Sequence, residues 1–407
     1  MSDDSDVALL PTGLSDRLPP DAEFEVRTVE RLLASFAQHG YERVKPPLIE
    51  FEESLLSGNG AAMSASTFRL MDPISQRMMA LRPDLTLQVA RIAATRLRNA
   101  PRPLRLSYAG QVLRVKGTQL RPERQFGQVG VELVGSSSPD ADAEVILMGI
   151  EALADIGVEN LSVDLGLPTL VPAVSAQLGL DDSASARLRD ALDRKDAAAV
   201  GAMGRQLGKD AAAMLVAMLD AAGPAEKALR RLERLDLPAE AAGERDILAQ
   251  VTDLVRAGAP QLKLTIDPVE NRGFEYHTGV TFTFFALDVR GELGCGGRYA
   301  AGNGGAAQEP ATGLSLFMDS VSRSLPTPPP ARRIYLPAGT PAKEGSRLHG
   351  EGWVTVAGLG HATGATSATD ATDATDAADA VAEAARMRCG HAFVDGTIRE
   401  AAPDKAD

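Results

Sequence analysis

The sequence predicts an α+β protein, in which an antiparallel sheet flanked by helices is followed by a small C-terminal α/β module. Residues 104–134 contain strand-like apolar runs on either side of a polar loop. Residues 280–287 are rich in β-branched and aromatic side chains, as strands are. Residues 167–260 consist largely of alanine, leucine and charged residues in helix-length blocks, which predicts a helical insertion within the sheet domain.

The N-terminal third supplies the first elements. Apolar residues recur at helical spacing over residues 24–38, and Gly40 lies just beyond the end of this predicted helix. The proline-bounded residues 44–49 predict an extended edge segment. Two short runs, 68–71 and 77–81, flank a turn at Asp72-Pro73, and residues 83–98 predict a helix with proline in its first turn.

The middle of the chain alternates between strands and helices. Residues 104–108, 111–115 and 128–134 read as strands, and a long basic loop over residues 116–124 connects the last two. Strands are also predicted at 161–165 and 262–267, on either side of the insertion. The glycine-rich residues 291–298 are interpreted as a place where backbones pack closely, because they lack the strand–helix context of a dinucleotide-binding loop.

Three parts of the chain follow from this reading. Residues 1–325 form the core, with the insertion at 167–260, and residues 326–330 form a stiff proline-rich linker. Residues 331–407 form the small module, with strands at 333–336 and 353–356 and a helix around 380–388. An Ala-Thr-Asp repeat predicts a disordered loop at about 362–379.

Composition restricts the classes of function. The formal net charge is 42 minus 55, or −13, which argues against broad binding of nucleic acid through phosphate neutralisation. The two cysteines, Cys295 and Cys389, lie far apart, so neither a disulfide framework nor a zinc site is expected. The acidic N-terminus is unlike a secretory leader, and apolar runs fall short of the ~18–20 residues of a membrane span. We therefore expect a cytoplasmic protein that uses no metal and no membrane.

One group of polar residues is suited to an amino acid with a ring. An ammonium group requires acceptors, a carboxylate requires a cation, and an imidazole requires partners at both nitrogens. The sequence places an acid and a hydroxyl two residues apart at a helix start, and two further pairs four residues apart. These candidates are Asp84, Thr86, Gln128, Glu132, Arg272 and Tyr276. Each taken alone has an ordinary structural reading, such as a helix cap for Asp84, and only the combination favours a ligand.

A second group is basic. Eight lysines and arginines lie between residues 96 and 124 against one acid, Glu123. Arg114, Arg121 and Arg124 lie on or beside the predicted strand–loop–strand unit, where guanidinium groups suit phosphate or a partner's acidic surface. Phe126 on the next strand suits either a stacked purine or the core. The sequence contains no Ser-His-Asp arrangement and no metal-ligand spacing, so we expect no catalytic residues and no cofactor.

Two segments resemble the amino-acid-binding signatures of histidyl-tRNA synthetases, which are class II aminoacyl-tRNA synthetases. They are Arg-Gln-Phe-Gly-Gln-Val-Gly-Val-Glu at 124–132 and Asn-Arg-Gly-Phe-Glu-Tyr-His-Thr-Gly at 271–279. Residues 41–47 are similar to motif 1 of that class, and Gly296-Gly297-Arg298-Tyr299 is similar to another family segment. The resemblance covers about four-fifths of the chain and implies a class II synthetase-like core.

The departures from that pattern are informative. The run Gly313–Asp319 stands where the synthetases carry Gly-x-x-x-Gly-x-Glu-Arg, and the arginine that holds the ATP phosphates in the family is missing. Lys116 replaces an acid in motif 2, and His277 replaces a tyrosine. A pocket without its catalyst resembles the synthetase-like regulatory subunits of ATP phosphoribosyltransferase.

That resemblance implies a set of partners. They are L-histidine as an effector, a short-form catalytic subunit of ATP phosphoribosyltransferase, and a homodimer within a hetero-octamer, in the first step of histidine biosynthesis. By motif position, Asp84, Thr86 and Gln128 would face the α-amino group, Glu132 and Tyr276 the imidazole, and Arg272 the carboxylate. The alternatives are a true histidyl-tRNA synthetase, a synthetase-like module that senses tRNA or histidine, and a scaffold with a vestigial pocket. The acidic charge argues against tRNA.

Overall fold

The computed structural model describes residues 9–117, 121–175, 178, 180–270, 276–287, 289–302, 308–326, 329–359 and 377–401. The contacts divide the chain into two compact units, Met1–Pro326 and Thr327–Asp407. We describe each by itself. Within the described residues, no helix is both long enough and apolar enough to cross a membrane.

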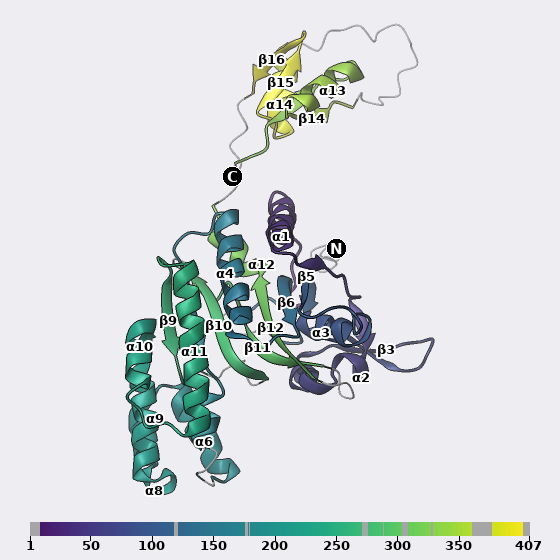
Figure 1. Ribbon diagram of the computed structural model, residues 1–407. Coiled ribbons are helices and arrows are strands. Elements are labelled where there is room, and N and C mark those ends of the chain that lie inside the picture. Colours follow the sequence, from purple (N-terminus) through teal and green to yellow (C-terminus); the bar gives the residue numbers. More distant parts are fainter. Residues whose placement is uncertain are drawn as a thin grey trace, which may run out of the picture. The chain divides into compact units, whose positions relative to one another are not determined.

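A nine-stranded sheet forms the centre of the first unit (Figure 1). Six neighbouring strands are antiparallel, and the pairs at the two ends of this antiparallel set, β1 with β5 and β7 with β9, are parallel. In spatial order the strands are β1 (Glu42–Arg43), β5 (Leu104–Leu113), β6 (Gln125–Val134), β12 (Glu309–Phe317), β11 (Gly294–Ala301), β10 (His277–Ala286), β7 (Leu161–Gly166), β9 (Lys263–Asp267) and β8 (Gly223–Pro224).

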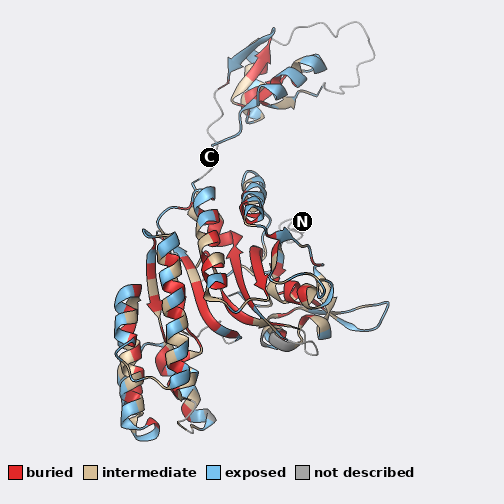
Figure 2. Ribbon diagram, viewed as in Figure 1, coloured by how far each residue is buried: buried red, intermediate tan, exposed pale blue. Residues whose placement is uncertain are grey.

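The two faces of this sheet bury different residues, as the alternation along β6 shows. Val129, Val131 and Leu133 belong to the larger core, which also includes buried residues of α1 (Asp21–Gln38), α4 (Pro139–Ile156) and α11 (Ala239–Gly258). Phe126 and Val134 belong to a second core with α3 (Thr86–Thr95). Since side chains alternate along a strand, Gln128 and Glu132 face the α3 side. Figure 2 shows the sheet as the most buried layer of the unit.

Helix α4 illustrates how local sequence sets an element's limits. The Ser138 hydroxyl accepts a hydrogen bond from the Asp140 amide at 3.3 Å, and Pro139 occupies the first turn. Gly157 ends the helix in the left-handed conformation, with φ of 105°. Between these limits Val145, Ile146 and Leu153 are buried against the sheet.

A small sheet and a set of short helices flank the α3 side of the first unit. The three strands β2 (Ile49–Phe51), β4 (Met78–Leu81) and β3 (Arg69–Met71) are antiparallel. Helix α2 (Glu52–Leu55) and a 3-10 segment, η2 (Gly58–Ser66), connect β2 to β3. The predicted edge segment at 44–49 is strand only at Ile49, and the predicted helix at 83–98 is shortened to α3.

The helical insertion lies between β7 and β9, as expected. Its buried leucines, among them Leu188, Leu215, Leu232 and Leu248, belong to the larger core. Its helices are α5 (Leu170–Ser175), α6 (Asp182–Asp193), α7 (Ala197–Ala202), α8 (Gly204–Leu207), α9 (Lys209–Ala221), α10 (Ala225–Leu232) and α11, and the two-residue strand β8 precedes α10.

The second unit is a three-layer α/β module. Its sheet has the order β14 (Val354–Ala357), β13 (Arg333–Leu336), β15 (His391–Val394) and β16 (Thr397–Glu400), with the first three parallel. Tyr335 packs in one cluster with α14 (Ala377–Arg386), and Ile334 packs in another with α13 (Ala342–Gly350). The expected loop at 362–379 lies outside the described residues up to 376, and residues 377–379 instead begin α14.

Candidate functional site

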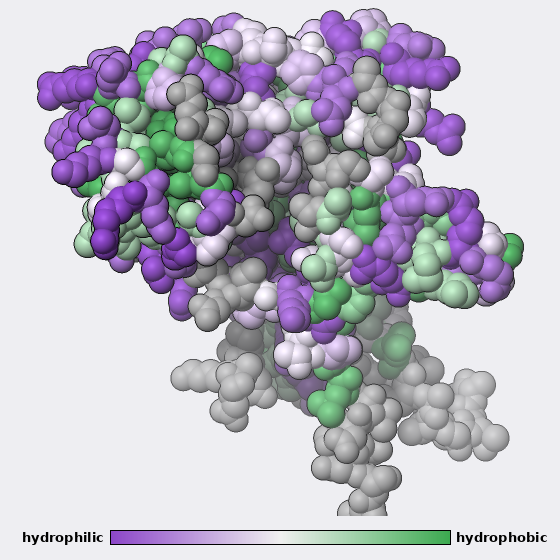
Figure 3. Space-filling model, turned by 90° about the horizontal axis from the view of Figure 1, so that it is seen from below, coloured by the Kyte–Doolittle hydropathy of each residue, from purple (hydrophilic) through white to green (hydrophobic). Residues whose placement is uncertain are grey.

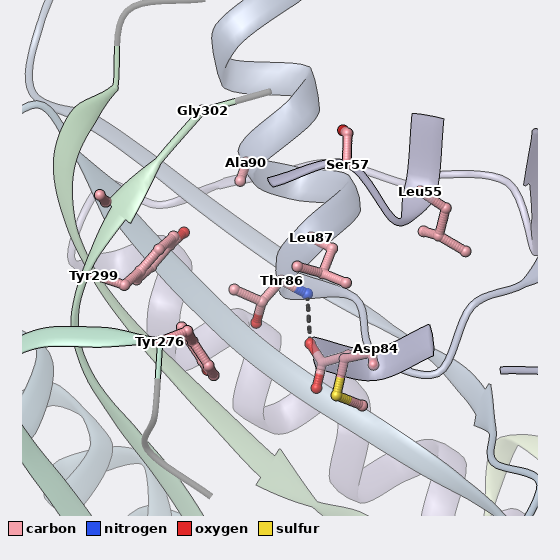
Figure 4. Close-up of a pocket in the computed structure, with 11 residues that line it drawn as sticks. Leu55, Ser57, Asp84, Thr86, Leu87, Ala90, Tyr276, Tyr299 and Gly302 are labelled. Atoms are coloured by element: carbon pink, nitrogen blue, oxygen red, sulfur yellow. Dashed lines mark hydrogen bonds between the residues drawn. The ribbon is translucent and has the colours of Figure 1, made fainter. Parts of the chain in front are cut away.

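A pocket opens on the α3 side of the large sheet, and we call it the central pocket. Tyr276 comes directly before β10 and Tyr299 belongs to β11, while Asp84 lies just before α3 and Thr86 begins that helix (Figure 4). Seen from below, the molecule is hollowed, and hydrophilic residues lie in the depth of the hollow (Figure 3). The lining residues are Leu55, Ser57, Met63, Asp84, Thr86, Leu87, Ala90, Tyr276, Tyr299, Ala300 and Gly302.

The acidic side of the central pocket is fixed by hydrogen bonds. Asp84 accepts the Thr86 amide at 2.8 Å through Oδ1 and the Gln128 side-chain amide at 3.2 Å through Oδ2. Gln128, which is buried, also accepts the Leu85 amide at 2.9 Å and donates to Ser315 at 2.7 Å. Gln128, which lies behind the pocket, therefore fixes Asp84 and Leu85 against the sheet.

Glu132 lies behind the tyrosine side of the central pocket. It is fully buried, and its two carboxyl oxygens accept hydrogen bonds from Tyr108 at 3.0 Å and Tyr299 at 2.9 Å. Burial raises the pKa of Glu132 to about 8, although these hydrogen bonds oppose the rise. A Cβ atom at Gly313 would lie 2.0 Å from this carboxyl group, so the glycine leaves the room that Glu132 occupies.

Hydroxyl groups connect the two sides. Tyr108 donates to Glu132 and so accepts from Thr86 at 3.1 Å and Ser315 at 3.0 Å. Burial raises the pKa of the Tyr108 and Tyr299 phenols, which stay protonated as donors. The pocket thus presents a carboxylate, a hydroxyl and two phenol rings in a fixed arrangement.

The structure brings together most of the expected ligand residues. Asp84, Thr86 and Tyr276 line the central pocket, whereas Gln128 and Glu132 lie directly behind it. Arg272 lies outside the described residues. Tyr108, Tyr299 and Ser315 were not among the predicted ligand residues. For Tyr299 a signal existed, because it ends the Gly-Gly-Arg-Tyr segment.

The glycine-rich segment 291–298 is largely a strand, β11, which the sequence analysis did not predict. A Cβ atom at Gly296 would lie 2.1 Å from the Gly313 carbonyl oxygen and 2.6 Å from the Phe282 ring. This strand therefore needs glycine for close approach to its neighbours, in agreement with the interpretation of close packing.

The Arg298 side chain extends away from the central pocket. Its guanidinium group donates to the buried Asp142 carboxylate at 2.7 Å and to the Ser138 carbonyl at 2.7 Å. Burial raises the pKa of Asp142, and the charge of Arg298 opposes that rise. Since Ser138 caps α4, this ion pair fixes β11 against the start of that helix.

Arg121, predicted to contact a phosphate or a partner, lies in the interior of the first unit. It is buried, forms ion pairs with Asp319 and Glu292 at 3.1 Å each, and lies 3.8 Å above the Phe317 ring. Phe126 packs edge-on against Phe317 at 5.8 Å, so it is a core residue in this structure. We call these five residues the Arg121 cluster. Arg121 thus pairs within the chain and is not presented to a phosphate or a partner's surface.

Arg124 and Arg114 also contact their own chain. Arg124 donates to the carbonyls of Arg114 at 3.3 Å and Thr12 at 3.1 Å. Arg114 donates to the Pro83 carbonyl at 3.3 Å and lies 3.8 Å from Asp84, so it is the one of the three expected arginines that borders the central pocket. Within the described residues, no group of three or more His, Cys, Asp or Glu side chains is arranged to hold a metal ion.

Comparison with known proteins gives this site a family. Residues 13–321 match the family model described as histidyl-tRNA synthetase. The chain is 61% identical over 359 residues to an ATP phosphoribosyltransferase regulatory subunit of Paramagnetospirillum magneticum, covering 88% of this chain and 93% of the relative.

Two solved structures show the same fold. One, described as an ATP phosphoribosyltransferase regulatory subunit/histidyl-tRNA synthetase from Bacillus halodurans, is 23% identical, with a TM-score of 0.74 over 89% of this chain and 94% of that one. The other, a chain of the ATP phosphoribosyl transferase (HisG:HisZ) complex from Thermotoga maritima, is 18% identical, with a TM-score of 0.57 over 72% and 97%. The chain belongs to the family of ATP phosphoribosyltransferase regulatory subunits, which is built on the fold of histidyl-tRNA synthetases.

Proposed function

We propose that this chain is the non-catalytic regulatory subunit of an ATP phosphoribosyltransferase and that its central pocket binds L-histidine as the feedback effector. The observation that carries the proposal is the contrast on one face of the sheet. The central pocket is open and presents a carboxylate, a hydroxyl and two phenol groups among apolar side chains, whereas the neighbouring Arg121 cluster is filled by its own side chains.

The groups of the central pocket suit the three polar parts of histidine. The Asp84 carboxylate and the Thr86 hydroxyl are acceptors for the α-ammonium group. Tyr276 and Tyr299, whose ring centroids are 6.2 Å apart, offer ring faces and phenol groups to the imidazole, with Glu132 behind Tyr299. From its sequence position, Arg272 would supply the cation for the ligand's carboxylate.

Residues next to the central pocket argue against aminoacyl adenylation by this chain. Ser320, which is buried, follows Asp319 where the synthetases carry the arginine that holds the ATP phosphates. Electrostatic stabilisation of phosphates is commonly among the largest contributions to such catalysis. The guanidinium of Arg121 is already paired with Asp319 and Glu292.

The partner follows from the family. A regulatory subunit needs a catalytic one, and we assign that role to a short-form ATP phosphoribosyltransferase subunit in the cytoplasm. The synthetase-like fold supports a homodimer of this chain within a hetero-octamer. The transferase residues would all lie on the catalytic subunit.

Regulation then follows from linkage. If histidine binds one conformation of the complex more tightly, that difference in affinity shifts the complex towards it, typically by about 1–3 kcal/mol. Tyr276 and Asp84 come from segments almost 200 residues apart, so a ligand that contacts both favours the arrangement in which the two segments are close together.

The first experiment measures ATP phosphoribosyltransferase activity of the catalytic subunit from the same genome, with and without this chain, across a histidine titration. We expect full activity only with both chains, and inhibition by histidine that weakens in Asp84→Asn. An Asp246→Asn variant, altered at an exposed aspartate of the insertion, is the matched control. The proposal fails if this chain changes neither the rate nor the histidine sensitivity.

The synthetase alternative is tested in parallel. A histidine-dependent exchange of pyrophosphate into ATP by the isolated chain would support adenylation and would contradict the non-catalytic assignment. We expect no exchange above background, while calorimetry on the same sample detects histidine binding.

A further inference from the structure

The turn after helix α6 carries a lysine where glycine is usually found. The amide of Lys195 donates to the Leu192 carbonyl at 2.9 Å, and the amide of Asp196 donates to the Ala191 carbonyl at 2.9 Å. These two bonds form a Schellman turn, in which Lys195 adopts the left-handed conformation with φ of 56°. This conformation costs a residue with a Cβ atom roughly 1 kcal/mol, which glycine would not incur.

The Lys195 side chain joins the helical insertion to the sheet. Its Nζ atom lies 2.7 Å from Asp267 Oδ2 and 3.8 Å from Glu270 Oε2. Asp267 ends β9 and also accepts the Val269 amide at 3.2 Å. One cation of the insertion thus contacts both ends of residues 267–270, which we call the 267–270 segment.

An apolar contact holds the same segment. Val269 is buried and belongs to the larger core. It lines a groove together with Leu188 and Leu192 of α6 and Val171 of α5. The insertion therefore holds the 267–270 segment both through an ion pair and through a buried side chain.

The 267–270 segment lies close in sequence to the central pocket. Tyr276, six residues after Glu270, lines that pocket, and His277 begins β10. Across the sheet, Gly166 of β7 pairs with Asp267 on one side and with Thr281 of β10 on the other. The Lys195 ion pair is therefore two strands from β10, or about 10 Å.

We infer that Lys195 is a positioning residue that holds the 267–270 segment and thereby sets the affinity of the central pocket for its ligand. This inference rests on the proposed binding of histidine. It makes the helical insertion a part of the effector site, although the insertion contributes no lining residue among those described. A partner that moved the insertion would change histidine affinity through this ion pair.

The decisive variant is Lys195→Gly. Glycine suits the left-handed turn, so we expect the urea midpoint of unfolding to stay the same or to rise. The ion pair is lost, so we expect the histidine dissociation constant from calorimetry to rise about two- to fivefold, the range of a partly exposed ion pair. A role confined to the stability of the insertion would lower the midpoint and leave the affinity unchanged.

Two companion variants complete the test. Lys195→Arg keeps the charge and should restore most of the affinity, whereas Lys209→Met, at an exposed lysine of α9, should bind histidine as the native chain does. Raising NaCl from about 50 to 500 mM should narrow the difference between the native chain and Lys195→Gly, because salt screens the pair.

The outcomes separate the two proposals. If the native chain binds histidine and Lys195→Gly binds it equally well, the role of Lys195 is refuted and the proposed function stands. If the native chain binds no histidine, both are refuted.

Discussion

The central pocket and the Arg121 cluster are neighbours on one face of one sheet, yet they use the same strands in opposite ways. Strand β6 contributes Phe126 to the cluster and Gln128 to the wall behind the pocket, and β12 contributes Phe317 and Ser315 in the same way. In the pocket, the buried Gln128 and Glu132 form hydrogen bonds to Asp84 and Tyr299, which line the pocket. In the cluster, an arginine, two carboxylates and two aromatic rings satisfy one another.

Similar residue types on one surface therefore have different roles. A charge that is accessible and held from behind, such as Asp84, is available to a ligand. A charge that is buried and paired, such as Arg121, is occupied within the chain, and removing its partner is strongly destabilising. Substitutions in the two regions should therefore affect different measurements.

The largest effect is expected from Asp319→Ala. Removing this carboxylate leaves the buried Arg121 with Glu292 as its remaining ion-pair partner among the described residues, so the free energy of unfolding should fall by about 3 kcal/mol. Histidine affinity should stay close to native. Urea unfolding and calorimetry measure the two quantities, and Asp246→Ala should change stability by no more than about 0.5 kcal/mol. A loss of affinity without a loss of stability would contradict the comparison.

The second prediction concerns pH and Glu132. Its pKa in the folded chain is about 8, well above the ordinary value of 4.5, so folding disfavours the charged form. The associated stability is present below the ordinary pKa and is lost as the pH rises towards 8. Relative to Glu132→Gln, the free energy of unfolding of the native chain should fall by roughly 3 kcal/mol between about pH 5 and 8.

Urea unfolding of both proteins at several pH values measures this difference, because the other titrating groups cancel. The exposed Glu240→Gln variant should run parallel to the native chain. Parallel curves for Glu132→Gln would show that Glu132 titrates normally.

The third prediction is a loss of histidine affinity with little loss of stability, the opposite of the first. Asp84→Asn keeps an oxygen that accepts the Thr86 amide but removes the charge that faces the ligand's ammonium group. The histidine dissociation constant should rise about tenfold, or ~1.4 kcal/mol, while the unfolding free energy changes by less than about 1 kcal/mol. Calorimetry checks this, with Asp246→Asn as the control. An unchanged affinity would remove Asp84 from the effector site.

The smallest effect is expected from Arg124→Ala. Its guanidinium group donates to two backbone carbonyls of its own chain, so stability should fall by about 1 kcal/mol. Association with the catalytic subunit, measured by analytical ultracentrifugation, should not change. A weakened complex would instead show that Arg124 contacts the catalytic subunit, as its basic surroundings in the sequence predicted.

Sequence patterns were sufficient where the signal is local. Apolar spacing located α1, and the change in composition located the insertion. The glycines of β11 concealed a strand, because a strand without β-branched residues becomes favourable only through its close neighbours. Helix α13 and strands β15 and β16 were also missed, since each is short and is stabilised by packing within its module.

The family, strands β6 and β10, and Asp84, Thr86 and Tyr276 of the central pocket could be predicted from spacing and motif order, which are properties of the chain, whereas β11 with Tyr299 could not. Which charges a ligand can reach depends on contacts between distant parts of the chain. Arg121 meets Asp319 from 198 residues away, and Tyr299 meets Glu132 from 167 residues away. Burial and pairing depend on such distant contacts, and no local pattern records them.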